Sequence, residues 1–309
     1  MYVFIVNPQA GSGRGMRIFS KLKKSTLFQT LEKMVYFTEY PGHAKKIAGQ
    51  INQLHDITTI IVIGGDGTLH EVINGLYHRR IPIGFIPGGS GNDFARGLAI
   101  HNKPNKLLKQ IVNSNEDLLY WVGSIIINQN EHKRFVNSVG FGFDAQITRM
   151  ANEASYKSLF NRLGLGKLTY IVALIQVLMK FKPMTIELEI NDEKKTLRDC
   201  WMLTTCNHPY YGGGMKIIPT AKIQDEVLPL LILHKISKWK VLSLFLTVFT
   251  GLHVKYKEVE IIETTGFKII SKDNVCAQID GQTFQCRMGT LTKRQEFINI
   301  RGRKYTQTV

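Results

Sequence analysis

The first third of the chain alternates short apolar runs with segments of helical periodicity. Four runs rich in β-branched residues each lead into a turn that contains glycine or proline, and they cover residues 2–6, 34–38, 58–63 and 81–86. Uninterrupted apolar runs of this length are typical of strands that are buried on both faces. The pattern therefore predicts a three-layer α/β domain with a mostly parallel sheet between helices.

Beyond about residue 119 the pattern changes to apolar runs separated by polar turns. These runs cover residues 121–127, 134–139, 185–190, 201–206, 227–233, 267–270 and 275–279. Their spacing predicts an antiparallel sandwich or barrel. Two segments that are apolar in the middle and basic at the ends, 167–182 and 237–257, are expected to be helical.

Charge restricts the classes of partner. The 40 Lys and Arg against 24 Asp and Glu give a formal net charge of +16, which indicates a partner that carries phosphate: a nucleotide, an anionic membrane surface or nucleic acid. The sequence shows no recognition helix or aromatic-basic array, so we expect no nucleic-acid partner. The segment 239–257 has lysines on both sides of an apolar centre. It fits either an interfacial helix that contacts an anionic membrane or a core helix with solvated ends.

Cysteine usage and hydropathy indicate the compartment. The four cysteines form no C-x-x-C pair, so neither a metal site nor a disulfide framework is indicated, and a reducing cytoplasm fits. The N-terminus lacks the features of a signal peptide, and the longest apolar stretches, about 14 residues, fall short of the roughly 20 that a spanning helix needs. We therefore expect a cytoplasmic protein, soluble or peripheral at the inner face of the membrane.

A glycine-rich loop, Gly-Gly-Asp-Gly-Thr at 64–68, follows the run 59–63 and precedes a helical segment. Its glycines allow backbone N–H groups to approach a phosphate chain, and the helix presents its positive N-terminal end to that chain. Asp66 can hold a magnesium ion or order the loop, and Thr68 can donate its hydroxyl. A tight turn is the alternative, because Thr68-x-x-Glu71 matches a capping box, and this capping role accounts for Glu71.

Two further loops follow strands in the same way. Residues 87–93, Pro-Gly-Gly-Ser-Gly-Asn-Asp, open a helix and predict a second phosphate or substrate contact, with Asn92 as a simple N-cap as the alternative. Residues 7–15 resemble a dinucleotide fingerprint, but the third glycine comes one position early, and the chain has no P-loop motif. Because ligands of parallel sheets bind outside the carboxyl ends of the strands, we expect the three loops to converge.

Short motifs extend this pattern through nearly the whole chain. They are Asn7-Pro-x-Ala-Gly11, Gly64-Gly-Asp-Gly-Thr68, Pro87-x-Gly89-Ser-x-Asn92-Asp93-Phe-Ala-Arg96, Phe135-Val-Asn137-x-x-Gly140-x-Gly142-Phe-Asp144-Ala, Asn207-x-Pro209-x-Tyr211-Gly-Gly-Gly-Met215, Pro219-x-Ala221-x-x-x-Asp225 and Asp280-Gly281. In this order they resemble the diacylglycerol kinase catalytic domain family, which includes bacterial lipid kinases and sphingosine kinases.

The resemblance implies a lipid kinase with two domains. An NAD kinase-like α/β ATP-binding domain would cover residues 1–121, with residues 300–309 returning to it, and an antiparallel β-sandwich lipid domain would cover 122–299. The implied reaction moves the γ-phosphoryl group of ATP to a lipid hydroxyl, of the diacylglycerol type, with magnesium.

The resemblance also implies roles for individual residues. The implied catalytic residues are Asp66, Asp93 and Asp280. The implied nucleotide contacts are Asn7, Thr38, Gly64, Gly65, Asp66, Gly67, Thr68 and Ser90. A structural magnesium ion would be held by the carbonyls of Lys222 and Val227 with the carboxylate of Asp225.

Three positions depart from the family's pattern. Bacterial members carry Asp-Gly-Glu near the end of the sandwich, with that Glu as the proposed base, and here the position is Gln282, whose amide has no titrating proton acceptor. An Asp that relatives place after the nucleotide domain aligns with Trp121 or Val122, and Glu226 stands where the metal turn normally has Gly. Asp280 is then a replacement base, a group that orients the hydroxyl, or the first residue of an Asp-Gly hairpin turn.

Three classes of function therefore stay open. The first is an active lipid kinase, because a general base contributes only about 10²–10⁴-fold to a reaction that depends mainly on positioning. The second is a catalytically impaired homologue that binds nucleotide or lipid in a regulatory role, which Trp121 and Gln282 favour. The third is an NAD kinase-like enzyme, which shares the Gly-Gly-Asp-Gly-Thr loop.

Overall fold

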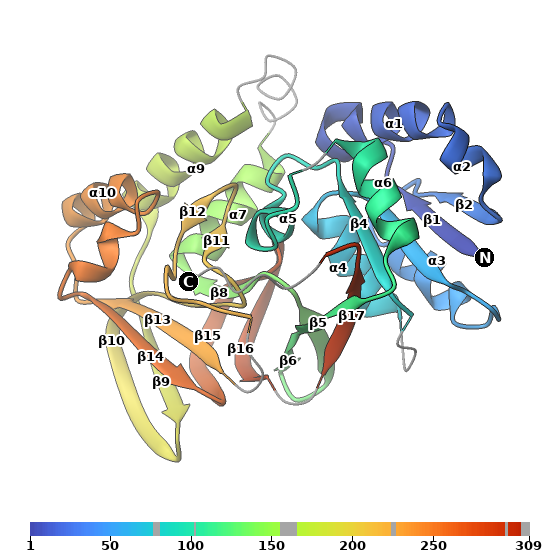
Figure 1. The fold of residues 1–309 in the computed structure, drawn as a ribbon. Helices are drawn as coiled ribbons and strands as arrows, with labels where there is room; N and C mark the ends of the chain where they lie inside the picture. The colour runs from blue at the N-terminus through green and yellow to red at the C-terminus, as the bar shows by residue number, and fades with distance from the viewer. Residues whose placement is uncertain (77–80, 102, 155–165, 224–226, 294–295, 304–309) are drawn as a thin grey trace. The chain divides into compact units, whose positions relative to one another are not determined.

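The computed structural model describes residues 1–76, 81–101, 103–154, 166–223, 227–293 and 296–303. The chain forms two compact units (Figure 1). Unit 1 comprises Met1–Tyr120 and the C-terminal segment that begins at Phe297, and unit 2 comprises Trp121–Glu296. Unit 2 is thus a single continuous segment inserted into unit 1, and the strand that follows it belongs to unit 1.

Unit 1 contains a six-stranded sheet in the order β2-β1-β3-β4-β17-β5. The strands are β1 (Tyr2–Val6), β2 (Lys33–Phe37), β3 (Thr59–Gly64), β4 (Ile83–Pro87), β5 (Asp117–Trp121) and β17 (Phe297–Arg301). Strand β1 pairs in parallel with β2 and β3, and β4 pairs in parallel with β3 and β17. The mostly parallel sheet predicted from the apolar runs is confirmed.

Helices cover the sheet of unit 1 and explain its apolar strands. They are α1 (Ala10–Lys23), α2 (Thr26–Thr30), α3 (His43–Ile51), α4 (Asp66–Gly75), α5 (Asp93–Gly97) and α6 (Pro104–Asn113). Helices α1 and α4 contact β3, α6 contacts β4, and α3 packs on α4. Residues 3–6 and 60–63 are fully buried, so a polar side chain in either run would lose its hydration.

The final strand β17 lies inside the sheet of unit 1, between β4 and β5. Its register places Ile300 beside Ile83 of β4. Arg301 donates from Nε and Nη2 to the two carboxylate oxygens of Asp117 in β5, at 2.7 and 2.9 Å. It also donates to the hydroxyl of Thr59 in β3, at 3.0 Å. Arg301 therefore fastens β17 to two strands that precede unit 2, β5 and β3.

Unit 2 is built on an antiparallel sheet in the order β14-β13-β10-β8-β15-β16-β6-β7, with β9 paired to both β10 and β15. Its strands are β6 (Gly123–Ile127), β7 (Glu131–Phe135), β8 (Ser138–Gly142), β9 (Met184–Ile190), β10 (Glu193–Cys206), β13 (Leu228–His234), β14 (Val259–Thr264), β15 (Gly266–Ile279) and β16 (Gln282–Thr292). A small hairpin, β11 (Tyr210–Tyr211) with β12 (Met215–Lys216), stands apart. The antiparallel β-sandwich expected for this part of the chain is confirmed.

Two long strands make the sheet fold over itself. The first part of β10 pairs with β9, and its second part pairs with β13 and β8, after a register shift between Leu197 and Cys200. Strand β15 likewise passes from β9 to β8 across a shift between Ile270 and Val275. Strands that change partners at bulges form the corners of sandwiches. The enclosed core is apolar and includes Phe135, Phe141, Leu203, Leu230 and Ile269.

Several expected runs have different limits in the structure. The run 121–127 was expected as one strand but is divided between β5, in the sheet of unit 1, and β6, in unit 2. The run 134–139 is divided between β7 and β8 because the amides of Val136 and Asn137 bind a side chain instead of a neighbouring strand. The runs 267–270 and 275–279 are one strand, β15, with a bulge between them.

The helices of unit 2 pack outside its sheet. They are α7 (Phe143–Glu153), α9 (Gly166–Lys180), α10 (Lys238–Thr247) and the 3₁₀ helix η1 (Leu252–Lys255). The expectation of one helix over 237–257 is wrong, because Gly251 adopts a left-handed φ of +81° and separates α10 from η1. Within the described residues, no helix combines the length and the apolarity that a membrane span requires.

Candidate functional site

The three glycine-rich loops of unit 1 meet at the carboxyl ends of β1, β3 and β4. The amide of Asn7 donates to the carbonyl of Ile63 at 2.9 Å, and the amide of Gly88 donates to the carbonyl of Gly64 at 2.7 Å. A Cβ on Gly11 would overlap the carbonyl oxygen of Gly88. The loops therefore touch through their backbones, and glycine is required where they touch.

Asn7 and Thr68 join the first loop to the second. Asn7 Nδ2 donates to Thr68 Oγ1 at 3.0 Å, and Asn7 Oδ1 accepts from the amides of Gln9 and Ala10 at 3.0 and 3.1 Å. The expected capping box is wrong, because Gly65 is the N-cap of α4 and no side chain caps it. Thr68 is only 5% exposed, and its hydroxyl accepts the hydrogen bond from Asn7.

Glu71 has a structural role, but a different one from that expected. Its two carboxylate oxygens accept from the amides of Gly42 and Ala44 at 2.9 and 3.1 Å. These amides lie at the start of α3, where unpaired N–H groups and the helix dipole favour a negative charge. Glu71 thus caps the neighbouring helix rather than its own.

Asp66 orders the loop that follows β4. Its Oδ1 accepts from the amide of Phe94 at 2.9 Å and its Oδ2 accepts from the amide of Asp93 at 3.2 Å, in the first turn of α5. Asp93 in turn accepts from Arg96 Nη1 at 2.8 Å and is 7% exposed. The structure thus brings Asp66 and Asp93 together, and the carboxylate of Asp66 holds the end of the loop 87–93 against the loop 64–68.

The side chain of Asn92 binds the backbone of its own loop, residues 87–93. Asn92 has a left-handed φ of 51°, and its side chain accepts from the amide of Gly89 and donates to the carbonyl of Gly89, both at 2.9 Å. Asn92 occupies the N-cap position of α5, as the alternative had it, but its side chain makes no capping hydrogen bond to that helix. Arg14 Nη1 also donates to the Gly89 carbonyl, at 2.9 Å, so a guanidinium lies at this junction.

The remaining predicted nucleotide residues flank the junction. Thr38 follows β2, is 8% exposed, and donates its amide to the carbonyl of Val6 at 2.9 Å. Ser90 is exposed at the tip of its loop. Glycine amides, the exposed hydroxyl of Ser90 and the guanidinium of Arg14 are groups suited to an anionic phosphate chain.

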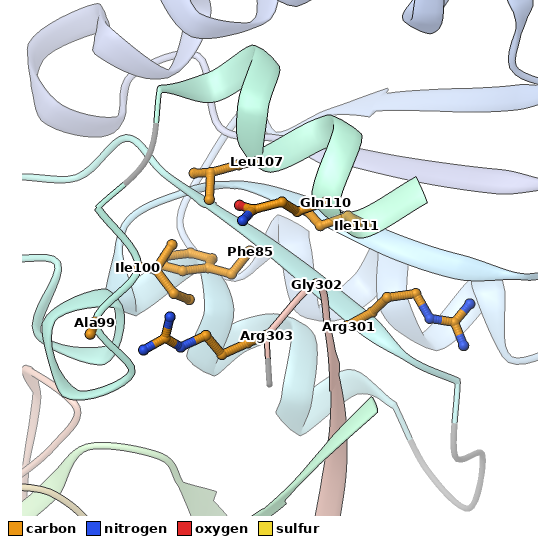
Figure 2. A pocket seen from close by; sticks show the side chains of 9 residues that line it. All are labelled: Phe85, Ala99, Ile100, Leu107, Gln110, Ile111, Arg301, Gly302 and Arg303. Carbon is orange, nitrogen blue, oxygen red and sulfur yellow. The ribbon is translucent and has the colours of Figure 1, made fainter. Parts of the chain in front are cut away.

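A separate pocket lies beside β4 (Figure 2), lined by Phe85, Ala99, Ile100, Leu107, Gln110, Ile111, Arg301, Gly302 and Arg303. In Figure 2 the Arg303 side chain extends toward Ala99, whereas Arg301 extends away from it. The Arg301 guanidinium is already bound to Asp117. None of the predicted site residues that the structure describes lines this pocket, so it is treated apart from the candidate site.

In unit 2, Asp280 begins the turn between β15 and β16. Asp280 and Gly281 have φ of 48° and 88°, which fits an Asp-Gly hairpin turn. The Asp280 carboxylate accepts from the amides of Val136, Asn137 and Ser138 at 3.0, 2.8 and 3.0 Å. Both oxygens therefore accept backbone hydrogen bonds, one at Oδ2 and two at Oδ1.

Asp144, in the motif Gly140-x-Gly142-Phe-Asp144-Ala, is a further candidate, for which the sequence predicts no role. It lies in the first turn of α7 and is 6% exposed. Its Oδ2 accepts from the hydroxyls of Thr204 and Tyr211 at 3.1 and 3.3 Å, and its Oδ1 has no hydrogen-bond partner within the described residues. Burial raises the pKa of Asp144 to about 6, against the opposing effect of these hydrogen bonds. Ionisable groups with such pKa values are typical of functional sites.

The predicted magnesium site is only partly described. Lys222 is exposed and Val227 is half-buried, but Asp225 lies outside the described residues, as does Glu226. Among the residues that are described, no group of three or more His, Cys, Asp and Glu side chains is placed to hold a metal ion. The assignment of Lys222, Asp225 and Val227 stays a prediction.

Comparison with known proteins agrees with this architecture. Residues 1–119 match the diacylglycerol kinase catalytic domain, and residues 137–294 match the YegS C-terminal NAD kinase beta sandwich-like domain. A Bacillus subtilis (strain 168) protein named "Putative lipid kinase YtlR" is 33% identical over 288 residues, which cover 91% of this chain and 93% of that protein. A "Diacylglycerol kinase" of Mycobacterium tuberculosis (strain ATCC 25618 / H37Rv) is 30% identical over 200 residues, 65% of this chain and 62% of that protein.

A solved structure shares the fold. The "Crystal structure of a putative diacylglycerol kinase from Bacillus anthracis str. Sterne" is 20% identical with a TM-score of 0.73, covering 97% of this chain and 94% of that one. With both domain matches and a relative that spans nearly the whole chain, the protein belongs to the diacylglycerol kinase catalytic domain family.

Proposed function

We propose that the protein is an ATP- and magnesium-dependent lipid kinase that transfers the γ-phosphoryl group to the hydroxyl of a diacylglycerol-type lipid. The observation that carries this proposal is the junction of three glycine-rich loops, which Asp66 and Asn7 hold together. Preorganised donors of this kind act on phosphoryl transfer by positioning the phosphates and stabilising their charge.

In this proposal the loops of unit 1 bind ATP. The amides of Gly64, Gly65 and Gly67 face the phosphates, with Ser90 adding a hydroxyl and Thr38 flanking the nucleotide. Asp66 and Asp93 act in catalysis by keeping the loop 87–93 in register with the loop 64–68, since the Asp66 carboxylate binds the Asp93 amide. The Arg14 guanidinium at the Gly89 carbonyl adds positive charge at the same junction.

The acceptor hydroxyl is assigned to unit 2. Asp280 shapes the segment 136–138 through three hydrogen bonds, which supports an orienting role for Asp280 over that of a base. Lys222, Asp225 and Val227 are proposed to hold a structural magnesium ion, with oxygen donors of the kind that magnesium prefers.

The proposed setting is the cytoplasm, with peripheral contact to an anionic membrane. The net charge of +16 supports attraction to negatively charged lipid, and the acceptor lipid would be drawn from that membrane. A catalytically impaired homologue is the second candidate, because Gln282 stands in place of the family's proposed base and the Asp280 oxygens are engaged.

Transfer of labelled γ-phosphate tests the proposal. Purified protein is incubated with ATP, magnesium and micelles of diacylglycerol, monoacylglycerol, sphingoid base or polyprenol. Asp66→Ala should abolish transfer, whereas Glu193→Ala, an exposed acid at the start of β10, should leave it unchanged. Label in one lipid supports the kinase and names its acceptor. No label in any lipid, with ATP binding intact, favours the impaired homologue.

A further inference from the structure

Helix α10 exposes apolar side chains on its outer face. Trp239 and Leu246 are 83% and 74% exposed, and Phe249, just beyond the helix, is 46% exposed. These positions and the half-buried Leu242 follow one another at spacings of three and four residues, which places them on one side of the helix. The opposite side is buried in the apolar core of unit 2 through Val241, Leu244 and Val248. The outer stripe is therefore not needed for that core.

Helix α9 continues this exposed surface. Its residues Ile171, Ile175 and Met179 are 40%, 50% and 70% exposed and recur at every fourth position. Lys238 Nζ, at the start of α10, donates to the carbonyl of Met179 at 2.8 Å, so the two helices adjoin there (Figure 1). We call the six side chains of Ile171, Ile175, Met179, Trp239, Leu246 and Phe249 the α9–α10 apolar surface.

The segments that carry this surface are basic. Residues 166–182 and 237–257 contain seven lysines and neither Asp nor Glu; the lysines are Lys167, Lys180, Lys182, Lys238, Lys240, Lys255 and Lys257. Lys240 is paired with Glu258 at 2.6 Å, whereas Lys180, Lys182, Lys238, Lys255 and Lys257 are exposed. The apolar surface thus has a positively charged border.

An apolar surface with a positively charged border fits an anionic bilayer better than it fits a second copy of the chain. A bilayer with anionic headgroups offers an apolar layer beneath negative charge, which matches an apolar stripe bordered by lysines. A second copy of the chain would bring the same positive charges together, and like charges oppose association. Helix α10 has 10 residues, so it suits a position in the interface and cannot span the membrane.

We propose that the α9–α10 apolar surface docks unit 2 on anionic bilayers, with Trp239 and Leu246 entering the interface. The inference rests on the proposed function only in its purpose, since docking would bring the enzyme to its lipid substrate. Trp239 suits this place because an indole pairs an apolar ring with a polar N–H.

Co-sedimentation with vesicles tests the surface in the absence of ATP and of acceptor lipid. Vesicles of phosphatidylcholine alone are compared with vesicles that also contain phosphatidylglycerol. The wild type should bind the anionic vesicles preferentially, and the double variant Trp239→Ser/Leu246→Ser should bind them at least about tenfold more weakly. The matched control is Ile126→Ser, an equally apolar residue that is 40% exposed on β6, and it should bind as the wild type does.

Further readouts separate the alternatives. Lys255→Gln/Lys257→Gln should weaken binding to anionic vesicles and leave the melting temperature unchanged. Equal binding by wild type and Trp239→Ser/Leu246→Ser, equal binding to neutral and anionic vesicles, or a lipid-free dimer that this variant dissociates would each overturn the proposal.

Docking and catalysis can fail separately. Phosphorylation of a short-chain diacylglycerol that is dispersed as monomers should be the same in wild type and Trp239→Ser/Leu246→Ser. If no lipid is phosphorylated but binding still depends on Trp239 and Leu246, the kinase proposal fails and the docking surface stands. If a lipid is phosphorylated and vesicle binding does not depend on Trp239 and Leu246, only the docking proposal fails.

Discussion

Asp144 holds its carboxyl group in surroundings that disfavour charge. Burial raises its pKa from 3.8 to about 6, so the folded protein takes up a proton more readily than the unfolded chain. The resulting contribution to the free energy of unfolding is fully present below about pH 3.8 and is lost as the pH rises through about 6. A shift of this size corresponds to about 3 kcal/mol.

Asp144→Asn is therefore expected to remove one pH-dependent contribution. The difference in unfolding free energy between wild type and variant should move by about 2.4 kcal/mol in favour of the variant from pH 4 to pH 8. Urea unfolding of both proteins across this range measures it, with the exposed Asp192→Asn as control. A difference that is constant with pH would contradict the raised pKa.

A substitution of Asp280 can distinguish a structural role in the hairpin turn from the role of a general base. Replacement by Asn leaves fewer acceptors for the amides of Val136, Asn137 and Ser138, and an unsatisfied buried amide costs about 1–3 kcal/mol. We expect Asp280→Asn to lose about this much unfolding free energy, to lower kcat, and to leave the KM for ATP unchanged. The control is Asp273→Asn, an exposed residue of β15. A kcat lower by about 10² or more without loss of stability would identify Asp280 as the base.

At the scale of elements, the glycines of the loops fall into two kinds. Gly11 has a left-handed φ of 56° and no room for a Cβ beside the Gly88 carbonyl, whereas a Cβ on Gly67 would meet no atom of the described residues within 4 Å. Gly11 is therefore required by the packing of the loops. Gly67, in the first turn of α4, is not required by the protein's own structure and is free to serve a ligand.

The two alanine variants should therefore separate stability from binding. Gly67→Ala is expected to gain about 0.5–1 kcal/mol of unfolding free energy, because alanine is the better helix former. It should weaken ATP binding about tenfold or more, because the methyl group would occupy space at the phosphates. Gly11→Ala should lose both stability and binding. Thermal unfolding with and without ATP measures each effect, and unaltered ATP affinity in Gly67→Ala would exclude its amide from the phosphate site.

At the scale of the whole molecule, the two parts of unit 1 that precede and follow unit 2 are joined by a contact between residues 184 positions apart. Arg301 of β17 binds Asp117 of β5 with two hydrogen bonds. The pair is partly exposed at 18% and 19%, so its contribution is moderated by water. The pair nevertheless links β17, a strand that follows unit 2 in the chain, to β5.

A double-mutant cycle on this pair tests the closure of unit 1. Arg301→Ala, Asp117→Ala and the double variant should give a coupling free energy of about 1–2 kcal/mol in urea unfolding. Arg198→Ala, an exposed residue of β10, serves as control. Additive effects of the two substitutions would mean that the sheet does not rely on this contact.

The parts of the fold that could be predicted are those that depend on the local pattern of apolar residues and glycines. Apolar runs with β-branched residues, followed by glycine turns, predicted the parallel strands of unit 1, and the shorter spacing after residue 119 predicted antiparallel strands. Strand limits were less predictable, because β15 runs through a polar bulge and β7 and β8 are interrupted inside an apolar run.

The sequence by itself determined where most of the strands lie and which turns carry glycine, and it predicted phosphate chemistry at the carboxyl edge of the first sheet, because periodicity and backbone freedom are local properties. The tertiary structure decided which groups satisfy one another. Glu71 caps a helix 29 residues away, Asp66 caps one 28 residues away, and Asp280 binds amides more than 140 residues away. Those partners, like the burial that raises the pKa of Asp144, exist only once distant segments pack together, and a buried polar group must then take whichever partner the packing brings.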